Sequence, residues 1–273
     1  MLDVKGWAGR GPIPLQARLR RALVQLVRFG WQQALACVFP VVIFAALAVT
    51  QTVPLPGLPR YDWLLLICLA MQVWMLRAGL ETRDELKVIT VFHLIGLALE
   101  LFKVHMGSWS YPGEGWTKLG GVPLYSGFMY ASVASYLCQA WRRLRVELTG
   151  WPPQWLAVPL AAAIYLNFFT HHYWIDVRWW LAGLVLLVFA RTWVYFEVGA
   201  RQYRMPLALS FVLIGFFIWV AENVATYFRA WEYPDQSDAW RLVHVGKVSS
   251  WLLLVIVSFL IVAALKQVKK GRF

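Results

Sequence analysis

The stretch ELFKVHMGSWSYP, Glu100 to Pro112, places an acidic side chain inside a long apolar run and ends in a loop rich in aromatic residues. A similar stretch, ENVATYFRAWEYP, runs from Glu222 to Pro234. In both stretches a glutamate lies nine residues before a tryptophan, and the tail reads Trp-x-Tyr-Pro. Four positions therefore match at a single offset of 122 residues, close to half of the 273-residue chain. This pattern predicts that the chain contains two equivalent halves.

The composition around these stretches indicates a membrane protein. Apolar residues make up 60% of the chain and charged residues 15%, which is more apolar surface than a soluble domain of this length can bury. An apolar run of about 18 or more residues is long enough to cross a bilayer as a helix. Eight runs of this kind are present, at residues 34–53, 61–80, 88–106, 122–141, 153–171, 174–196, 205–226 and 243–266. Because the runs are continuous rather than alternating, the sequence predicts an all-α polytopic membrane protein with about eight transmembrane helices.

The matched stretches divide the predicted helices into two sets of four. Residues 31–150 would hold the first four-helix repeat and residues 151–267 the second. Because four is an even number, both sets would insert with the same orientation, as a parallel 4+4 repeat about an axis along the membrane normal. Residues 1–30 would form a cytoplasmic segment with an amphipathic helix in the membrane interface, and residues 268–273 a basic cytoplasmic tail.

The basic residues are distributed unevenly along this predicted topology. The formal net charge is +12, and with eight spans 19 of the 26 Lys and Arg residues fall on the side that carries both termini. Lys and Arg are enriched in cytoplasmic loops, so both termini are predicted to be cytoplasmic. The basic excess thus reflects topology and contact with anionic membrane lipid, and we do not expect nucleic-acid binding.

Motifs for cofactor or metal chemistry do not emerge from the sequence. The three cysteines lie far apart within predicted spans and form no CxxC pair, which argues against a disulfide or zinc framework. His171 and His172, with Asp176 nearby, have side chains that could bind a transition metal, but adjacent histidines on a helix point apart, so no metal site is assigned. Nucleotide-binding loops and the G-x-S-x-G elbow are also missing, and no cofactor is predicted.

Ionisable side chains recur at helical spacing near both glutamates. His93, Glu100 and Lys103 share one face of the third predicted helix, and Glu222 and Arg229 share one face of the seventh. Ionisable residues at such depth usually face the protein interior or a water-filled cavity. If the two halves are related by a twofold axis, the two glutamates face one another in a common chamber.

Two carboxyl groups in one low-dielectric pocket cannot both ionise cheaply, so one should keep its proton at neutral pH unless Lys103 or Arg229 compensates it. A protonated carboxyl beside an ionised one can work as an acid and base pair. The candidate catalytic residues are Glu100, Glu222, Tyr111 and Tyr233. The candidate substrate-binding residues are His93, Lys103, Trp109, Tyr125, Tyr136, Asn223, Arg229, Trp231, His244 and Lys247.

Several runs carry a resemblance to a known family: FGWQQALACVFP, LPRYDWLLLICLAMQ, GLETRDELKVITVFHLIGLALELFKV, GSWSYP and GVPLYSGFMYASVASY. They resemble the YoaT-like family of uncharacterised bacterial integral membrane proteins, from about residue 29 through the last predicted helix. The resemblance implies a multi-pass protein of the bacterial inner (plasma) membrane and brings no activity with it.

A weaker resemblance is to membrane-bound carotenoid hydratases and lycopene cyclases. It is carried by Glu100, Trp109, Tyr111 and the run from Gly121 to Leu124. The resemblance implies acid–base steps on long isoprenoid chains without a redox cofactor.

These observations favour acid–base modification of an apolar, isoprenoid-like lipid in an intramembrane pocket. Glu100 and Glu222 would be the acid and the base, and Trp109 and Trp231 would be aromatic walls that stabilise a carbocation. One alternative is a proton-coupled carrier of a small solute. Another is a structural or assembly protein, in which each glutamate closes a local pair, Glu100 with Lys103 and Glu222 with Thr226 or Arg229. The sequence does not decide whether the chain is an enzyme, and it does not give the oligomeric state.

Overall fold

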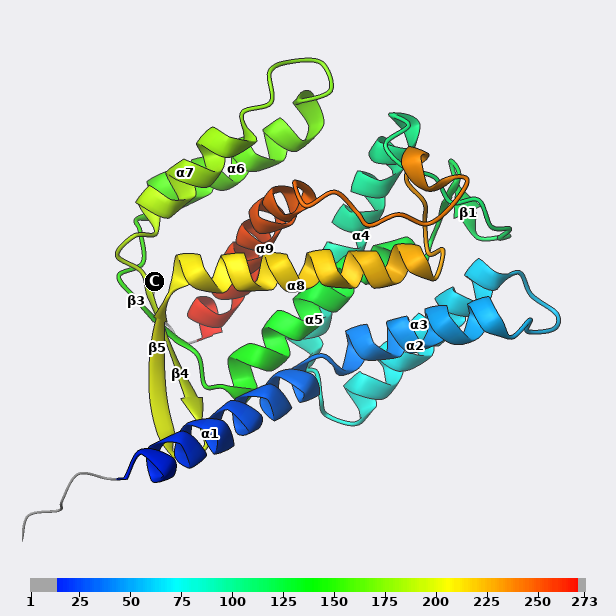
Figure 1. Ribbon diagram of the computed structural model, residues 1–273. Coiled ribbons are helices and arrows are strands. Elements are labelled where there is room, and N and C mark those ends of the chain that lie inside the picture. The colour runs from blue at the N-terminus through cyan, green and yellow to red at the C-terminus, as the bar shows by residue number, and fades with distance from the viewer. Residues whose placement is uncertain (1–13, 270–273) are drawn as a thin grey trace, which may run out of the picture.

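The computed structural model describes residues 14–269, without the side chains of residues 264–269. Residues 1–13 of the predicted N-terminal segment and residues 270–273 of the predicted basic tail lie outside the described residues. The described chain is mostly helical, as the sequence predicts (Figure 1).

The helices are α1 (Leu15–Ala36), α2 (Val38–Thr52), α3 (Arg60–Arg77), α4 (Arg83–His105), α5 (Ser126–Arg143), α6 (Gln154–Thr170), α7 (Arg178–Val188), α8 (Leu207–Tyr227), the short 3₁₀ helix η1 (Pro234–Gln236) and α9 (Lys247–Lys269). Two short strands, β1 (Lys118–Leu119) and β2 (Val122–Pro123), form a hairpin between α4 and α5. The strands β3 (Glu147–Thr149), β4 (Trp193–Val198) and β5 (Arg201–Pro206) form an antiparallel sheet in that order.

Each of the eight predicted apolar segments contains a helix, but fewer helices have the length and composition of a complete membrane span. Among the described residues, α4 and α8 are long and apolar enough to cross a membrane. A third span results if α1 and α2, which meet at a bend of 68°, are counted together. The apolar parts of α6, α7 and α9 are shorter. The structure thus supports membrane association, while eight complete crossings stay a prediction.

One predicted helix is wrong over its second half. The sequence predicts a single helix over residues 174–196, but α7 ends at Val188 and β4 begins at Trp193. The β4 sequence, WVYFEV, consists largely of aromatic and β-branched residues, which favour strands. It pairs with β5 across a turn in which Gly199 has a φ of +61°, a conformation that favours glycine. Because a short apolar run reads alike as helix or strand, the all-α prediction misses this sheet.

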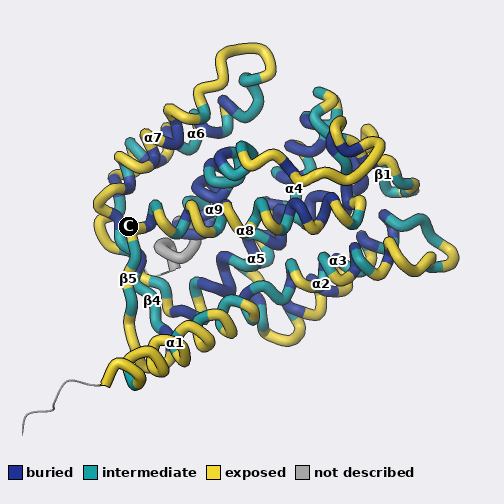
Figure 2. Tube along the Cα trace, viewed as in Figure 1, coloured by how far each residue is buried: buried dark blue, intermediate teal, exposed yellow. Residues whose placement is uncertain are grey.

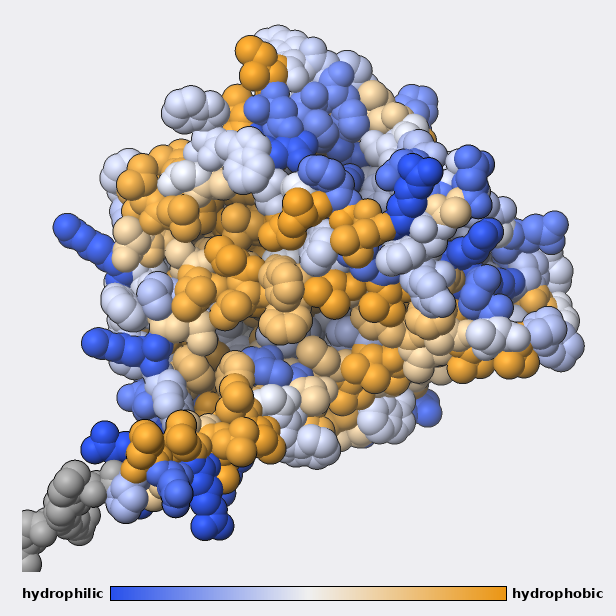
Figure 3. All heavy atoms as spheres, viewed as in Figure 1, coloured by the Kyte–Doolittle hydropathy of each residue, from blue (hydrophilic) through white to orange (hydrophobic). Residues whose placement is uncertain are grey.

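The helix α8 has an exposed apolar face and a buried face that carries polar residues toward its C-terminal end. Glu222, Asn223 and Thr226 are buried. The exposed apolar residues recur at helical spacing: Leu209, Val212, Leu213, Phe216, Phe217, Val220, Val224 and Tyr227. Figure 2 shows the alternation of buried and exposed positions along this helix, and Figure 3 shows apolar side chains over its middle, with hydrophilic groups toward both ends. A continuous apolar stripe of this length suits contact with lipid rather than with water.

The first residue of α3 fixes the end of α8. The Arg60 guanidinium donates hydrogen bonds to the carbonyl oxygens of Phe228 (2.6 Å) and Arg229 (2.8 Å). Carbonyl groups at the end of a helix lack partners within the helix, so a guanidinium is a suitable donor for them. Arg60 also donates to the carbonyl oxygen of Leu47 (3.2 Å), and so joins α2, α3 and α8.

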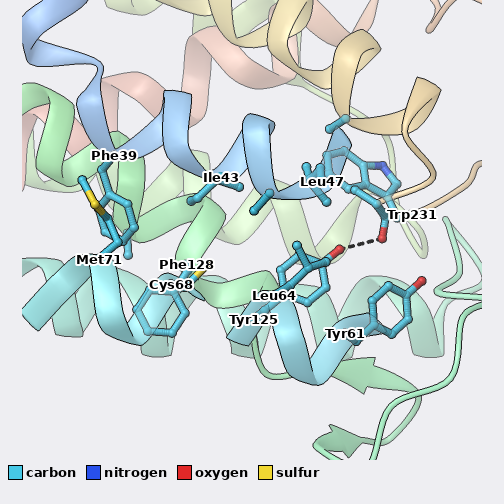
Figure 4. Close-up of a cluster of buried hydrophobic side chains, with 14 of the residues drawn as sticks. Phe39, Ile43, Leu47, Tyr61, Leu64, Cys68, Met71, Tyr125, Phe128 and Trp231 are labelled. Carbon is cyan, nitrogen blue, oxygen red and sulfur yellow. Dashed lines mark hydrogen bonds between the residues drawn. The ribbon is translucent and has the colours of Figure 1, made fainter. Parts of the chain in front are cut away.

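Two further contacts hold the loops that follow α4 and α8. Asp62, also in α3, accepts hydrogen bonds from the backbone N–H groups of Trp116 (2.7 Å) and Thr117 (2.9 Å). The buried Tyr125 hydroxyl donates to the carbonyl oxygen of Ala230 (2.7 Å), as the close-up of the core around Tyr125 shows (Figure 4). The two Trp-x-Tyr-Pro loops are therefore anchored to the same group of helices.

Close packing of α4 on α5 gives a direct test of this arrangement. A Cβ atom at Gly96 would lie 2.5 Å from Cγ of Tyr130. We expect Gly96→Ala to destabilise the protein by about 1–3 kcal/mol, because the added methyl group overpacks the interface. Thermal unfolding in detergent measures the change.

The matched control is Gly183→Ala in α7, where an added Cβ meets no atom within 4 Å. Its melting temperature should stay unchanged or rise, since alanine favours helix by up to about 1 kcal/mol. Equal losses for both variants would contradict the described packing of α4 against α5.

Candidate functional site

The Glu100 carboxyl group is buried and accepts three hydrogen bonds. Its side chain, presented by α4, is 3% exposed. Oε2 accepts from Nε1 of Trp109 (2.7 Å) and from the Tyr111 hydroxyl (2.7 Å), both in the loop that follows α4. Oε1 accepts from the Tyr130 hydroxyl (2.8 Å), which α5 provides. Both oxygens are thus satisfied by aromatic donors, with no cation among them.

The Glu222 carboxyl group is held in the same manner. It is 2% exposed and lies on the inner face of α8. Oε1 accepts a hydrogen bond from the Tyr233 hydroxyl in the following loop, and Oε2 accepts from Nε1 of Trp251 in α9 (2.6 Å). In each half, therefore, one donor comes from the loop tyrosine 11 residues on and another from the next long helix.

The two Trp-x-Tyr-Pro loops contact one another directly. Ser110 and Glu232, the middle residues of the two motifs, exchange both backbone N–H···O hydrogen bonds at 3.0 Å each, as an antiparallel bridge. The rings of Trp109 and Tyr233 meet edge to face, with centroids 5.9 Å apart. The paired loops bring the two halves of the site together.

Both glutamates line one apolar cavity of about 750 Å³, a volume within the range typical of sites for small molecules. Glu100 and Glu222 are the charged residues of its described lining, and the other polar lining residues, such as Gln33 and Tyr136, are uncharged. The remaining wall is largely aliphatic and aromatic and extends toward Phe29. Val41 and Phe217 line this cavity and are also exposed at the surface, 56% and 65% respectively. The cavity therefore reaches the apolar outer surface between α2 and α8.

Lys103 does not pair with Glu100. Its ammonium group lies 2.8 Å from Nε2 of His172 and 3.4 Å from Nε2 of His171, and 4.2 Å from the ring centroid of Phe168. Partial desolvation of the ring and the nearby Lys103 lower the pKa of His172 to about 4. The imidazole is therefore neutral at pH 7 and can accept the ammonium hydrogen bond.

The second predicted local pair is not formed either. Arg229 is exposed at the end of α8, and no ion pair to Glu222 is present among the described side chains. The local pairs that the structural alternative requires are therefore replaced by the aromatic donors.

Other predicted residues also reach this region. The Lys247 ammonium lies 4.6 Å from the ring centroid of Tyr233 and 5.6 Å from that of Trp109. Tyr136 and Trp231 line the large cavity. Tyr111 lies behind the cavity wall and reaches the site through its bond to Glu100.

Five predicted substrate-binding residues do not line the described cavities. Tyr125 holds the backbone of the second loop, and the Asn223 amide oxygen accepts from the backbone N–H of Val243 (2.8 Å). The His93 ring packs on Phe128, with centroids 4.4 Å apart. The remaining two, Arg229 and His244, are exposed. Among them, Tyr125 and Asn223 hold loop backbone and His93 takes part in packing.

Comparison with known proteins places the chain in a family. The family described as "Protein of unknown function (DUF817)" matches residues 25–259. The chain belongs to the DUF817 family. The "Uncharacterized protein YoaT" of Bacillus subtilis (strain 168) is 76% identical over 250 residues, which are 92% of this chain and 95% of that protein. The predicted resemblance to YoaT-like proteins is thereby confirmed.

A solved structure is also similar to this DUF817 protein. It is described as a crystal structure of a cross-linked MvINS trimer, and the match covers 67% of this chain and 94% of that chain. The TM-score is 0.48 and the sequence identity 14%. A likeness at this level carries no argument about function.

Sequence reasoning missed two of the hydrogen-bond donors in this DUF817 site. Tyr130 and Trp251 follow their glutamates by 30 and 29 residues. The sequence does contain a signal for them, because an aromatic residue with a polar donor follows each glutamate at nearly the same number of residues. Tyr130 is hidden because Tyr125 and Tyr136, the tyrosines predicted as site residues in this segment, lie on another face of a helix.

The pairing of the two loops can be tested by cross-linking. Residues of a hydrogen-bonded antiparallel pair have Cα atoms about 5.5 Å apart. In a background with the three native cysteines replaced by alanine, we expect the double variant Ser110→Cys/Glu232→Cys to be bridged by a short bifunctional thiol reagent. Intact-protein mass spectrometry should show one bridging reagent and no free thiol.

The control is the pair of single variants, each of which should add one reagent that has reacted at one end only. A double variant that adds two separate reagents would show that the loops are not adjacent.

Proposed function

We propose that this protein carries out acid–base chemistry on an apolar, isoprenoid-like lipid within the membrane. The observation that carries the proposal is the placement of Glu100 and Glu222. Both are buried, come from different halves of the chain, and line one apolar cavity of about 750 Å³. A pocket of this kind can hold a hydrocarbon chain and present it to two carboxyl groups at one end.

The route of entry supports a lipid substrate. Val41 of α2 and Phe217 of α8 belong both to the cavity wall and to the exposed apolar surface. A hydrophobic molecule can therefore pass sideways from the bilayer without crossing water. The polar residues at the inner end would then meet the substrate last.

The surroundings of the two carboxyl groups suggest different roles. The Lys247 ammonium lies over the ring of Tyr233, whose hydroxyl is bonded to Glu222. A nearby cation favours the ionised form of Glu222, which suits a base. Glu100 is buried and has no cationic partner among the described side chains, which suits a carboxyl that keeps its proton. When Glu100 is protonated, its O–H can donate a hydrogen bond to the hydroxyl oxygen of Tyr111 or Tyr130, because a hydroxyl group can rotate and act as acceptor.

The proposed reaction is a proton addition followed by a proton removal. Glu100 gives its proton to one carbon of a double bond, and the positive charge forms on the neighbouring carbon. The aromatic faces at the end of the cavity, Trp109 among them, stabilise that charge. Glu222 then takes a proton from a carbon adjacent to the charge, so the double bond moves. If a second double bond of the chain first attacks the cation, a ring closes, and Glu222 takes the proton from a carbon adjacent to the new cation. The sequence of steps is redox-neutral and needs no cofactor.

The proposal includes the topology that the sequence predicts: a parallel 4+4 repeat in the bacterial inner membrane, with both termini in the cytoplasm. Ser110 and Glu232 occupy equivalent motif positions and pair with each other as an antiparallel bridge. A twofold axis brings equivalent residues together in this way. The equivalent placement of donors around Glu100 and Glu222 further supports the repeat.

The two alternative functions have less support. A proton-coupled carrier needs ionisable groups along a path toward both sides, whereas Glu100 and Glu222 are the only charged residues in the described lining of the large cavity. A structural protein would be expected to close Glu100 and Glu222 with cations, whereas aromatic donors hold both carboxyls. The carrier function would regain support if uptake of a solute driven by a pH gradient were lost in both Glu→Gln variants.

The acid–base proposal is tested by Glu100→Gln and Glu222→Gln. Each variant replaces a carboxyl group by an amide that cannot transfer the proton, so we expect conversion of the lipid to fall by about 10²–10⁴-fold. Lipid mass spectrometry compares a bacterial strain that lacks the gene with the same strain expressing wild-type protein or each variant.

The matched control is Glu114→Gln, which changes an exposed glutamate in the loop after α4. This variant should give the wild-type lipid profile. The proposal fails if both buried-site variants, expressed at the wild-type level, also give that profile.

A further inference from the structure

A second, smaller cavity of about 100 Å³ lies beside the two glutamates and is lined by three cations, Lys103, Arg178 and Lys247. Tyr233 and Glu222 line both this cavity and the large apolar one. A cationic chamber thus adjoins the polar end of an apolar chamber.

Two of the three cations lack an acidic partner. Among the side chains that the structure describes, neither Lys103 nor Lys247 lies within 4.0 Å of a carboxylate. Arg178 is paired with Asp176 (Nε to Oδ2, 2.5 Å) and donates to Ser250 (3.1 Å). The only carboxylate in the lining is Glu222, whose oxygens already accept from aromatic donors. The chamber therefore carries an excess of positive charge.

The burial of Lys103 makes this excess informative. Lys103 is 4% exposed, and its ammonium group donates to the imidazoles of His171 and His172. A buried ammonium group without a counter-charge is costly, and neutral acceptors offset only part of the cost. The imidazoles orient the ammonium group and leave its charge uncompensated. An anion in the chamber would supply the missing charge.

We propose that this cationic chamber binds the phosphate or diphosphate headgroup of an isoprenoid lipid whose tail lies in the large apolar cavity. This inference rests on the proposed function, because it names the substrate class of the same site. Lysine ammonium groups are strong point charges for phosphate, and an arginine guanidinium can bind it through two nitrogens. Because the chambers meet at Tyr233 and Glu222, a bound headgroup would place the start of the tail beside the carboxyl groups.

The test compares ligands that share one tail and differ in the head. Purified wild-type protein in phosphatidylcholine nanodiscs is titrated with geranylgeranyl phosphate, with geranylgeraniol and with inorganic phosphate, and binding is followed by tryptophan fluorescence. We expect the phosphate ester to bind at least about tenfold more tightly than the alcohol, since each charged hydrogen bond is typically strong enough for such a factor. Inorganic phosphate should bind more weakly than the ester, because it lacks the tail.

The variant Lys247→Gln should remove most of the preference for the ester and leave the affinity for the alcohol unchanged. The matched control is Lys87→Gln, a lysine near the start of α4 whose side chain is 78% exposed and does not line the chamber. This control should keep the wild-type preference.

The outcomes separate the two proposals. Equal affinity of wild-type protein for the ester and the alcohol would overturn the headgroup site and leave the apolar pocket intact. Binding of neither isoprenoid would count against the proposed function and the headgroup site together. Inorganic phosphate binding as tightly as the ester would show a site for free phosphate and overturn the assignment to a lipid.

Discussion

A carboxyl group buried among apolar residues must have its oxygens satisfied by hydrogen-bond donors. This structure satisfies two such groups, at Glu100 and at Glu222. Glu100 and Glu222 receive their donors from tryptophan and tyrosine rather than from lysine or arginine. Aromatic donors bring a polar tip on an apolar body, so they satisfy the carboxyl without adding charge to the interior. The result is a pair of carboxyl groups that neutral donors hold in place, without an ion pair to lysine or arginine among the described side chains.

This arrangement depends on how the surrounding loops are held. The donors lie partly in two irregular loops, which would be mobile if their backbone groups were unpaired. Arg60 and Asp62, both in the first turn of α3, bind the end of α8 and the loop after α4 respectively. The bridge between Ser110 and Glu232 then joins one loop to the other. Positioning of each carboxyl group therefore relies on contacts made by the opposite half of the chain.

The same physics accounts for the distribution of polar groups around the site. Apolar side chains on α8 face outward, where lipid can cover them, and ionisable groups gather inward around the two cavities. Among the described side chains, Lys103 and Lys247 lie in this interior with no carboxylate within 4.0 Å. A charge that the protein does not neutralise itself is best understood in relation to a ligand that does. In the proposed complex, one ligand therefore occupies both the cationic chamber and the apolar cavity, which share Tyr233 and Glu222 in their linings.

The sequence by itself determined the helical character of the chain, the positions of most helices, the DUF817 relationship and the two glutamate motifs. These features are local, because hydrophobic runs and fixed spacings are read along the chain. It did not distinguish β4 from a helix, since WVYFEV is apolar enough for either and only the partner strands decide.

Only the tertiary structure decided which side chains meet. Lys103 lies three residues after Glu100 on the same helix but contacts His172 instead. Tyr130 and Trp251 come from other helices and donate hydrogen bonds to the glutamates. Such partners lie about 30 to 70 positions apart in the chain. Their choice depends on how the helices pack and on which groups must share a water-poor interior, and spacing along one helix carries no information about either.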